Sequence, residues 1–302
     1  MAKLTTQPVV DLVSLSQDFD TDAECRVYLE KLRWPKGVTC PRCQSQKISR
    51  IAARKVFDCD GCRYQFSVTA GTIFHDSHLP LPKWFLAIFL ISESKKGMSA
   101  LQLKRLLKVS YKTAWYLCHR IRESMKTDGT NLLTGTIEVD ETYIGGKPRY
   151  KVGMGNYRTR KQMVMAAIER GGDVRIQTGK WGNRRTLHKF INECAPDAAR
   201  IMTDELPAYK GIADAETTHE TVTHSKKEYV RGDIHTNTVE GAFGLFKRSI
   251  VGSFHQISVK HMDRYLDEFE FRYNNRKNAY LFRDTLLRLC DGKALPYDKL
   301  TA

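Results

Sequence analysis

Two pairs of cysteines constrain the fold of this 302-residue sequence more than any other feature. Cys40 and Cys43 form one C-x2-C motif, and Cys59 and Cys62 form a second one after an interval of fifteen residues. Each motif directs two sulfurs to one point, so the two motifs together supply the four thiolates of a tetrahedral zinc site. Because sulfur fills every position, the zinc would be structural, and its binding would fold a segment too small to hold a core alone. We therefore expect a zinc ribbon at residues 36–76.

The charge balance indicates the kind of partner. Lysine and arginine number 49 against 34 aspartates and glutamates, which gives a net charge of +15 and a pI near 9.4. Such an excess favours a polyanion, either nucleic acid or an anionic membrane. No apolar run reaches the roughly 18–20 residues of a membrane span, and residues 1–20 do not resemble a signal peptide. We expect a cytoplasmic, nucleoid-associated protein, in which Cys118, Cys194 and Cys290 are buried free thiols.

The length of the chain predicts two or three domains, and changes in pattern divide it into five segments. We expect an α/β multidomain protein. Its segments are an N-terminal lead with one short helix at 1–35, the zinc ribbon at 36–76, a basic helical region at 80–127, a mixed-sheet domain at 133–290 and a C-terminal tail at 291–302.

The helical region has the pattern of a helix-turn-helix. Residues 83–94 form an apolar helix, and Ser99 and Ser110 are typical N-caps of a second and a third helix. Apolar residues recur at intervals of three and four in the third helix, so the residues between them should face outward. The basic character of the region favours DNA contact over a solvated linker. The outward residues that we expect to contact DNA are Lys112, Thr113, Tyr116, His119 and Arg120.

A second basic segment occupies residues 145–161, which hold six basic residues, no acids and four glycines. Composition alone favours an ordinary solvated loop. Beside an active strand, however, such a loop could follow a phosphate backbone. Its candidate DNA contacts are Lys147, Arg149, Lys151, Arg158, Arg160 and Lys161.

Three carboxylates occupy positions that suit an active site in the mixed-sheet domain. Residues 135–144 alternate as a strand with Asp140 in its middle, and residues 199–203 form a buried strand that ends on Asp204. Residues 235–240 open a helix, since Thr and Asn are good N-caps, with Glu240 in its first turn and Lys247 nearly two turns later on the same face. Strands at 162–169 and 173–179 and a helix at 184–194 lie between, so Asp140 and Asp204 should be neighbours in one sheet.

Each carboxylate has a rival reading. Glu138 shares the strand face of Asp140, whereas Glu141 points to the other face, and either could be the ligand if the register differs. Glu205 is a similar rival to Asp204. Glu240 could instead close a capping box by accepting a hydrogen bond from the backbone N–H of Asn237.

The order Asp140, Asp204, Glu240 resembles the Asp, Asp, Glu triad of DDE transposases and retroviral integrases, enzymes with an RNase H-like fold. The phrases EVDETYIGG, HSKKEYVRGDIHTNTVEG and LFKRSIVG resemble the zinc-ribbon insertion-sequence transposases called ISXO-like. This resemblance covers residues 25–290. It implies an RNase H-like catalytic domain at 133–290 and a helix-turn-helix that binds DNA.

The resemblance also implies a chemistry. Two Mg²⁺ ions, for which Mn²⁺ can substitute, would be held by Asp140 between them and by Asp204 and Glu240 on either side. Lys247 would steady the phosphate, and Asn237 is the rival third residue because some members have Asn there. The expected function is cleavage at the terminal inverted repeats of an insertion sequence and strand transfer into target double-stranded DNA, by a homodimer or larger assembly. The alternatives are a DNA-binding regulator derived from a transposase and a DNA nuclease without strand transfer.

Overall fold

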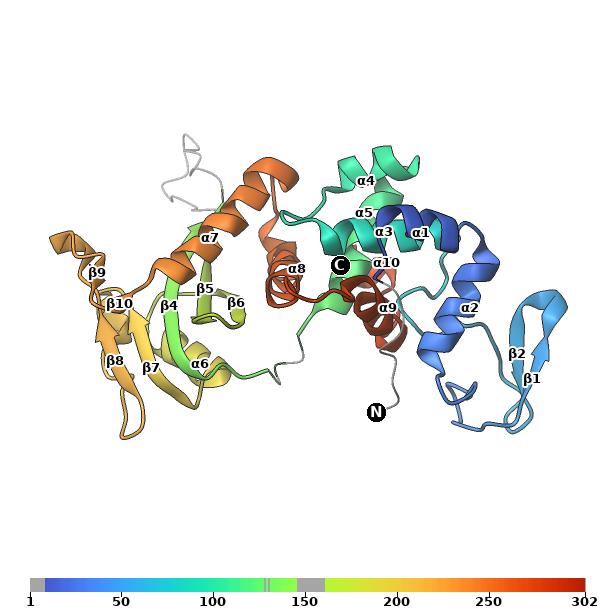
Figure 1. Ribbon diagram of the computed structural model, residues 1–302, viewed down its shortest axis with the longest axis horizontal. Helices are drawn as coiled ribbons and strands as arrows, with labels where there is room; N and C mark the ends of the chain where they lie inside the picture. Colours follow the sequence, from blue (N-terminus) through green and yellow to red (C-terminus); the bar gives the residue numbers. More distant parts are fainter. Residues whose placement is uncertain (1–8, 128, 130, 146–160, 302) are drawn as a thin grey trace, which may run out of the picture. The chain divides into compact units, whose positions relative to one another are not determined.

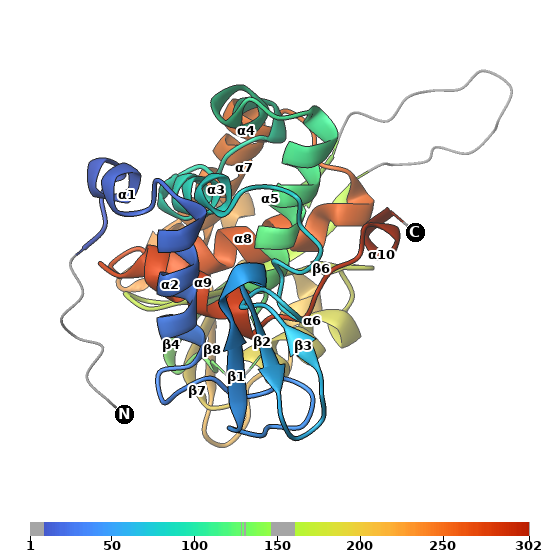
Figure 2. The ribbon, with the colours of Figure 1, turned by 90° about the vertical axis from the view of Figure 1, so that its right-hand side faces the viewer.

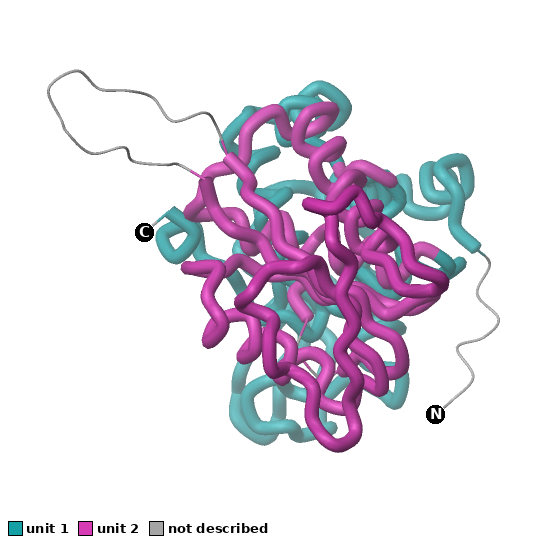
Figure 3. The backbone as a smooth tube through the Cα atoms, turned by 90° about the vertical axis from the view of Figure 1, so that its left-hand side faces the viewer, with its two compact units in different colours: residues 1–94, 98–125, 277–302 teal, residues 95–97, 126–276 magenta. Residues whose placement is uncertain are grey.

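The structure is a computed structural model, and it describes residues 9–127, 129, 131–145 and 161–301. The chain divides into two compact units (Figure 3). Unit 1 comprises residues 1–94, 98–125 and 277–302, and unit 2 comprises residues 95–97 and 126–276. Among the helices of the described residues, none combines the length and the apolar character that crossing a membrane requires.

Unit 1 consists of helices and one small sheet. Side chains cap several of its helices: Thr21 and Glu24 form a reciprocal capping box at the start of α2, and the Ser99 hydroxyl accepts from the Gln102 N–H at the start of α4. The helices of unit 1 are α1 Leu12–Asp18, α2 Asp22–Arg33, α3 Leu81–Glu93, α4 Ala100–Leu107, α5 Tyr111–Met125, α9 Leu281–Asp291 and α10 Tyr297–Thr301.

The small sheet of unit 1 is antiparallel, and Figure 2 shows its strands side by side. Its strands are β1 Ile48–Ile51, β2 Val56–Cys59 and β3 Gln65–Phe66, with the 3-10 turn η1 Ala52–Arg54 between β1 and β2. Phe57 and Phe66 pack with Cys40 and Cys59 in its core, and Trp34 lies against them. So few apolar side chains make a marginal core, which agrees with the need for a metal.

Helix α9 lies in unit 1, where it contacts α2, α3 and α5. The domain limits drawn from the sequence placed residues up to 290 with the mixed sheet. The chain instead leaves unit 2 at Arg276 and returns to unit 1. The physical reason is the apolar face of α9, because Phe282 packs against Phe85 and Phe89 of α3.

Unit 2 is built on a five-stranded mixed sheet with the order β6-β5-β4-β7-β8 (Figure 1). The first three strands are antiparallel neighbours, whereas β7 runs parallel to β4 and to β8. This is the strand layout of an RNase H-like fold, as the sequence predicted. The strands are β4 Gly135–Ile144, β5 Gln162–Glu169, β6 Val174–Gly179, β7 Ala198–Thr203 and β8 Thr218–Thr221.

Helices cover both faces of this sheet. Helix α6 (Arg184–Cys194) packs on the face to which Ile137 and Val139 of β4 point. Helices α7 (Asn237–Ser249) and α8 (Met262–Asn274) pack on the opposite face, as Figure 1 shows for α6 and α7. Successive side chains of a strand alternate between faces, so the even-numbered residues of β4 point towards α7.

Short elements complete unit 2. They are η2 Pro207–Tyr209, η3 His224–Lys226, the two-stranded β9 Val230–Arg231 and β10 Ile234–His235, the π-helical segment η4 Ile250–Phe254, and η5 Val259–His261. The 3-10 turn η5 leads directly into α8.

Candidate functional site

Asp140 and Asp204 lie side by side at one edge of the sheet. Thr136, Ile137 and Glu138 of β4 pair in parallel register with Arg200, Ile201 and Met202 of β7. Continuing this register by two residues puts Asp140 opposite Asp204, which directly follows β7. Both residues have even numbers on strands whose odd residues Ile137 and Ile201 face α6. The two carboxylates therefore share the face covered by α7.

Electrostatics brings Glu240 into the same group. Burial and the negative charges of Glu141, Asp204 and Glu240 together raise the pKa of Asp140 to about 7, against a hydrogen bond from the Glu141 N–H that lowers it. Glu240 lies in the first turn of α7, and α7 packs against β4. The charges of Asp204, which follows β7, and of Glu240, on α7, thus both act on Asp140 of β4. A set of oxygen ligands with unbalanced negative charge fits a hard divalent cation such as Mg²⁺.

The contacts of Glu240 exclude the capping-box reading. The Thr236 hydroxyl donates to its carboxylate at 2.9 Å, and His224 Nε2 lies 3.8 Å from the same oxygen. The N-cap of α7 is Thr236, not Asn237, and it makes no side-chain cap. Asn237 is exposed at the first position of the helix, and Lys247 is exposed in its last turn. His224 was not among the residues predicted from the sequence; the one signal that points to it is its place in the HSKKEYVRGDIHTNTVEG phrase that leads into α7.

Glu138 is fully buried and its carboxylate is saturated by donors. It accepts from Arg170 Nε at 2.7 Å and from the backbone N–H groups of Thr238 at 2.7 Å and Val239 at 3.2 Å. The first N–H groups of a helix have no partner within it, so Glu138 satisfies two of them from across the sheet. Glu138 is thus engaged elsewhere and is no rival to Asp140.

The other two rivals are also engaged. Glu141 points to the α6 face, where its carboxylate accepts a 2.6 Å hydrogen bond from the hydroxyl of the buried Tyr209. Burial raises the pKa of Glu141 despite this bond. Glu205 accepts from the backbone N–H of Ser225 at 3.1 Å and from its hydroxyl at 2.9 Å. The alternation of the strand predicted the direction of Glu141.

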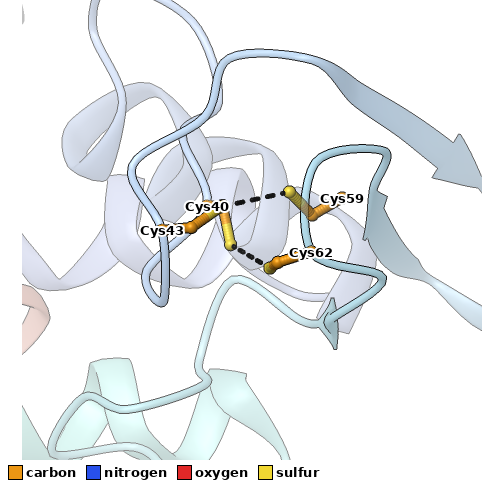
Figure 4. Close-up of side chains that lie close together, drawn as sticks. All are labelled: Cys40, Cys43, Cys59 and Cys62. Atoms are coloured by element: carbon orange, nitrogen blue, oxygen red, sulfur yellow. Dashed lines mark hydrogen bonds between the residues drawn. The ribbon is translucent and has the colours of Figure 1, made fainter.

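The four cysteines of unit 1 form a second cluster (Figure 4). Their Sγ atoms all lie within 4.8 Å of one another, with Cys40 3.7 Å from Cys62 and Cys43 3.5 Å from Cys59. Both knuckles turn in the same way, since the residue after each second cysteine, Gln44 or Arg63, has a positive φ. This donor set fits a structural zinc ion.

The outward face predicted for α5 is exposed at Lys112, as expected, but is covered farther along the helix. His119 and Arg120 are buried, and Arg120 donates to the backbone carbonyls of Ile73 and His75. Tyr116 donates through its hydroxyl to the Leu295 carbonyl in the returning C-terminal segment. That segment covers the face that periodicity left free.

Exposed basic side chains lie instead on α4 and at the start of α5. Thr113 is half-buried and Lys112 is exposed, with its ammonium 4.6 Å from the Tyr297 ring centre. The other exposed cations at this corner are Lys104, Arg105 and Lys108. Of the candidate contacts in the second basic segment, Lys161 is exposed, whereas Lys147, Arg149, Lys151, Arg158 and Arg160 lie outside the described residues.

Comparison with known proteins supplies the family. Residues 132–274 match the ISXO2-like transposase domain, and residues 20–65 match the transposase zinc-ribbon domain. An uncharacterized protein in transposable element ISH50 of Halobacterium salinarum is 29% identical over 263 residues, which are 81% of this chain and 88% of that protein.

Two solved structures also show similarity. The Mos1 strand transfer complex matches 68% of this chain and 75% of its own with 13% identity and a TM-score of 0.28. A pre-cleavage Mos1 transpososome matches 70% of this chain and 80% of its own with 14% identity and a TM-score of 0.25.

The two family matches together span more than half of the chain, one over the mixed sheet with its three carboxylates and one over the cysteine knuckles. The chain therefore belongs to the ISXO2-like transposases, insertion-sequence enzymes of the DDE type with an N-terminal zinc ribbon.

Proposed function

We propose that this transposase cuts DNA at the terminal inverted repeats of its own insertion sequence and joins the freed ends to target DNA. The proposal is supported by the parallel register that sets Asp140 opposite Asp204 and by the charge of Glu240, which acts on Asp140. Asp140 is the central residue, because the charges of both other carboxylates act on it. Such an arrangement is unfavourable unless a cation or a proton balances it.

Two Mg²⁺ ions, when bound, would supply a deprotonated water and neutralise the leaving oxygen of a phosphodiester. Asp140 would be shared between the ions, with Asp204 holding one and Glu240 the other. The Thr236 hydroxyl orients the Glu240 carboxylate, and His224 lies close enough to hold a proton beside it. Lys247, exposed on α7, would bind a phosphate of the DNA end.

DNA docking would use the α4–α5 corner, which we define as Lys104, Arg105, Lys108 and Lys112. These four cations are exposed around the turn between two helices, the position from which a helix-turn-helix meets the phosphate backbone. Lys108 adopts a left-handed conformation with φ 52° and closes α4, so the turn is tight. Because strand transfer requires both element ends to be held together, we expect at least a homodimer on DNA.

The test is magnesium-dependent nicking of a duplex that carries the element end, with a second, unlabelled duplex as the target. Wild-type protein should nick the end and join it to the target. Asp204→Asn and Glu240→Gln should bind the same duplex with unchanged affinity and not cut it. Nicking without joining would favour a nuclease, and binding without nicking by the wild type would favour a regulator.

The same assay identifies the third carboxylate position. Glu240 is the candidate on the structure, because its charge reaches Asp140, whereas Asn237 is exposed one turn earlier. Asn237→Ala should therefore retain nicking. Loss of nicking in Asn237→Ala together with normal nicking in Glu240→Gln would transfer the role to Asn237.

A further inference from the structure

Glu138 is a buried carboxylate that lies close in sequence to the candidate metal ligand Asp140. Its side chain is fully buried, and it lies on the same strand and the same face as Asp140, two residues away. Burying a carboxylate is costly unless hydrogen bonds and positive charge compensate for it. The partners that compensate for Glu138 therefore show what its position requires.

Both oxygens of Glu138 are fully used. Oε1 accepts from Arg170 Nε at 2.7 Å and from the Thr238 hydroxyl at 2.8 Å, and it lies 3.2 Å from His235 Nδ1. Oε2 accepts from the backbone N–H groups of Thr238 at 2.7 Å and Val239 at 3.2 Å. Every donor except Arg170 belongs to the start of α7 or to the residues before it. Glu138 is thus the N-terminal cap of α7, supplied by β4 instead of by the helix itself.

Arg170 connects Glu138 to the segment that precedes α7. While its Nε binds Glu138, its other nitrogens donate to the backbone carbonyls of Asp233 at 2.7 Å and His235 at 3.1 Å. The ion pair therefore holds both the incoming chain and the first turn of α7. A negative charge at this end of a helix is also favoured by the helix dipole.

We propose that Glu138 is a positioning residue for the carboxylate cluster: it ties the first turn of α7 to β4 and thereby sets the distance between Glu240 and Asp140. Val239, whose N–H Glu138 holds, directly precedes Glu240. On β4, Asp140 lies two residues after Glu138, which corresponds to about 6.5 Å along an extended strand. This inference rests on the proposed function, because it assigns a purpose to the spacing of the metal-binding carboxylates. Glu138 itself does not contact the metal, since neither oxygen is free.

The test compares Glu138→Gln with a matched control. An amide accepts only through its oxygen, so two of the four hydrogen-bond donors to Glu138 lose their acceptor. Glu268→Gln is the control, because Glu268 is equally buried in unit 2 and pairs with Arg272 at 3.2 Å on α8, away from the start of α7. Removing a partner of a metal-binding group typically costs about 10–100-fold in metal affinity or activity. Glu138→Gln should therefore need about 10–100-fold more Mg²⁺ for half-maximal nicking, and saturating metal should restore part of the rate.

Two further readouts do not depend on activity. Mn²⁺ binding, measured by paramagnetic resonance in the absence of DNA, should weaken in Glu138→Gln by a similar factor and stay unchanged in Glu268→Gln. Amide hydrogen exchange should accelerate at Thr238 and Val239 in Glu138→Gln alone. If wild-type protein does not nick DNA, the proposed function fails, and these two measurements still decide the role of Glu138.

Equal losses in the two variants at equal loss of melting temperature would overturn the proposal, since Glu138 would then contribute only to stability. Unchanged Mn²⁺ affinity in Glu138→Gln would do the same. Should Glu138→Gln not fold, Thr238→Val removes one donor to Oε1 and keeps the backbone N–H. It should weaken Mn²⁺ binding about two- to tenfold, within the lower part of the range for such partners. No weakening in this variant would count against the proposal.

Discussion

The cysteine cluster of unit 1 and the carboxylate cluster of unit 2 have opposite relations to the fold around them. The four cysteines come from two short knuckles, and the small core of the ribbon includes two of them. The three carboxylates come from β4, from the end of β7 and from α7, elements that two extensive cores already hold. We expect the ribbon to depend on its metal site for its fold, whereas the carboxylate site depends on a fold that those two cores hold without it.

The difference has a thermodynamic side. In a segment that cannot otherwise fold, the free energy of zinc binding supplies the free energy of folding. The carboxylates instead oppose the fold, because Asp140 is half-buried and three other negative charges act on it, so its pKa rises to about 7. Loss of one cysteine should therefore unfold the ribbon. Loss of one carboxylate should leave the stability of unit 2 unchanged or increase it.

Replacing Cys59 by serine should abolish the ribbon. Structural zinc contributes about 10–16 kcal/mol to such small domains, far more than the aromatic core around Phe57 can supply. We expect the variant to lose stoichiometric zinc, measured by atomic absorption, and the amides of β1–β3 to exchange freely. Amides of β4 and β5 should keep wild-type protection. Equal loss of protection in both units would break the contrast.

Replacing Asp140 by asparagine should have the reverse outcome in unit 2. Nicking should fall by about a thousand-fold or more, equivalent to about 4 kcal/mol of transition-state stabilisation. The melting temperature without added Mg²⁺ should stay the same or rise, because one buried charge is removed from a cluster of like charges. Single-turnover kinetics and calorimetry on one preparation measure both effects.

Glu141→Gln is the matched control for the register of β4. Glu141 is the next residue, carries the same charge and points to the opposite face, where Tyr209 holds it. We expect nicking within about tenfold of wild type, the loss expected of a neighbouring charge rather than of a ligand. Normal nicking in Asp140→Asn with no nicking in Glu141→Gln would shift the register by one residue and overturn the assignment of the site.

The raised pKa of Asp140 predicts a pH dependence of stability. Its pKa is about 7 in the folded chain against an ordinary value of 3.8, so the folded state binds more protons than the unfolded state between these values. Stability then falls as pH rises from about 4 to about 7, and the loss is complete above the folded pKa. Without added Mg²⁺, the melting temperature of Asp140→Asn minus that of wild type should increase from pH 5 to pH 8. A constant difference would contradict the burial of this charge.

Sequence and structure agree where short-range pattern decides the outcome. The strand around Asp140 and the buried strand before Asp204 follow from local alternation, and the cysteine spacing identifies the ribbon. The parallel pairing of β4 with β7 could be expected from the order of elements. The role of Glu138 could not, because its partners Thr238 and Val239 lie on α7, which no local pattern brings to β4.

Helix α5 shows the same limit for a surface. Its periodicity predicted a helix and one buried stripe, and both are present. The second side of the helix is also covered, because residues 277–302 return to unit 1 and place Leu295 against Tyr116. Where a distant segment will pack depends on the whole chain, so His119 and Arg120 were expected to be exposed and are buried.

The smallest expected effect concerns the α4–α5 corner. Lys104→Ala and Lys108→Ala should each weaken binding to the element end by about tenfold or less, and each should reduce the slope of log affinity against log salt concentration by about 1, because each removes one phosphate contact. Fluorescence anisotropy over a range of salt concentrations measures both quantities. Melting temperature should not change, since both side chains are exposed.

Two control variants distinguish an effect of the α4–α5 corner from an effect of net charge and from an effect of stability. Lys189→Ala removes the same charge from an exposed site on α6 of unit 2, so an unchanged salt slope there would show that net charge is not the cause. Arg120→Ala removes a buried side chain that holds the carbonyls of Ile73 and His75, so it should lower the melting temperature. A reduced salt slope in Arg120→Ala at unchanged stability would mean that the sequence had identified the right face of α5 after all. Equal salt slopes in Lys104→Ala and Lys189→Ala would show that the α4–α5 corner is not the docking surface.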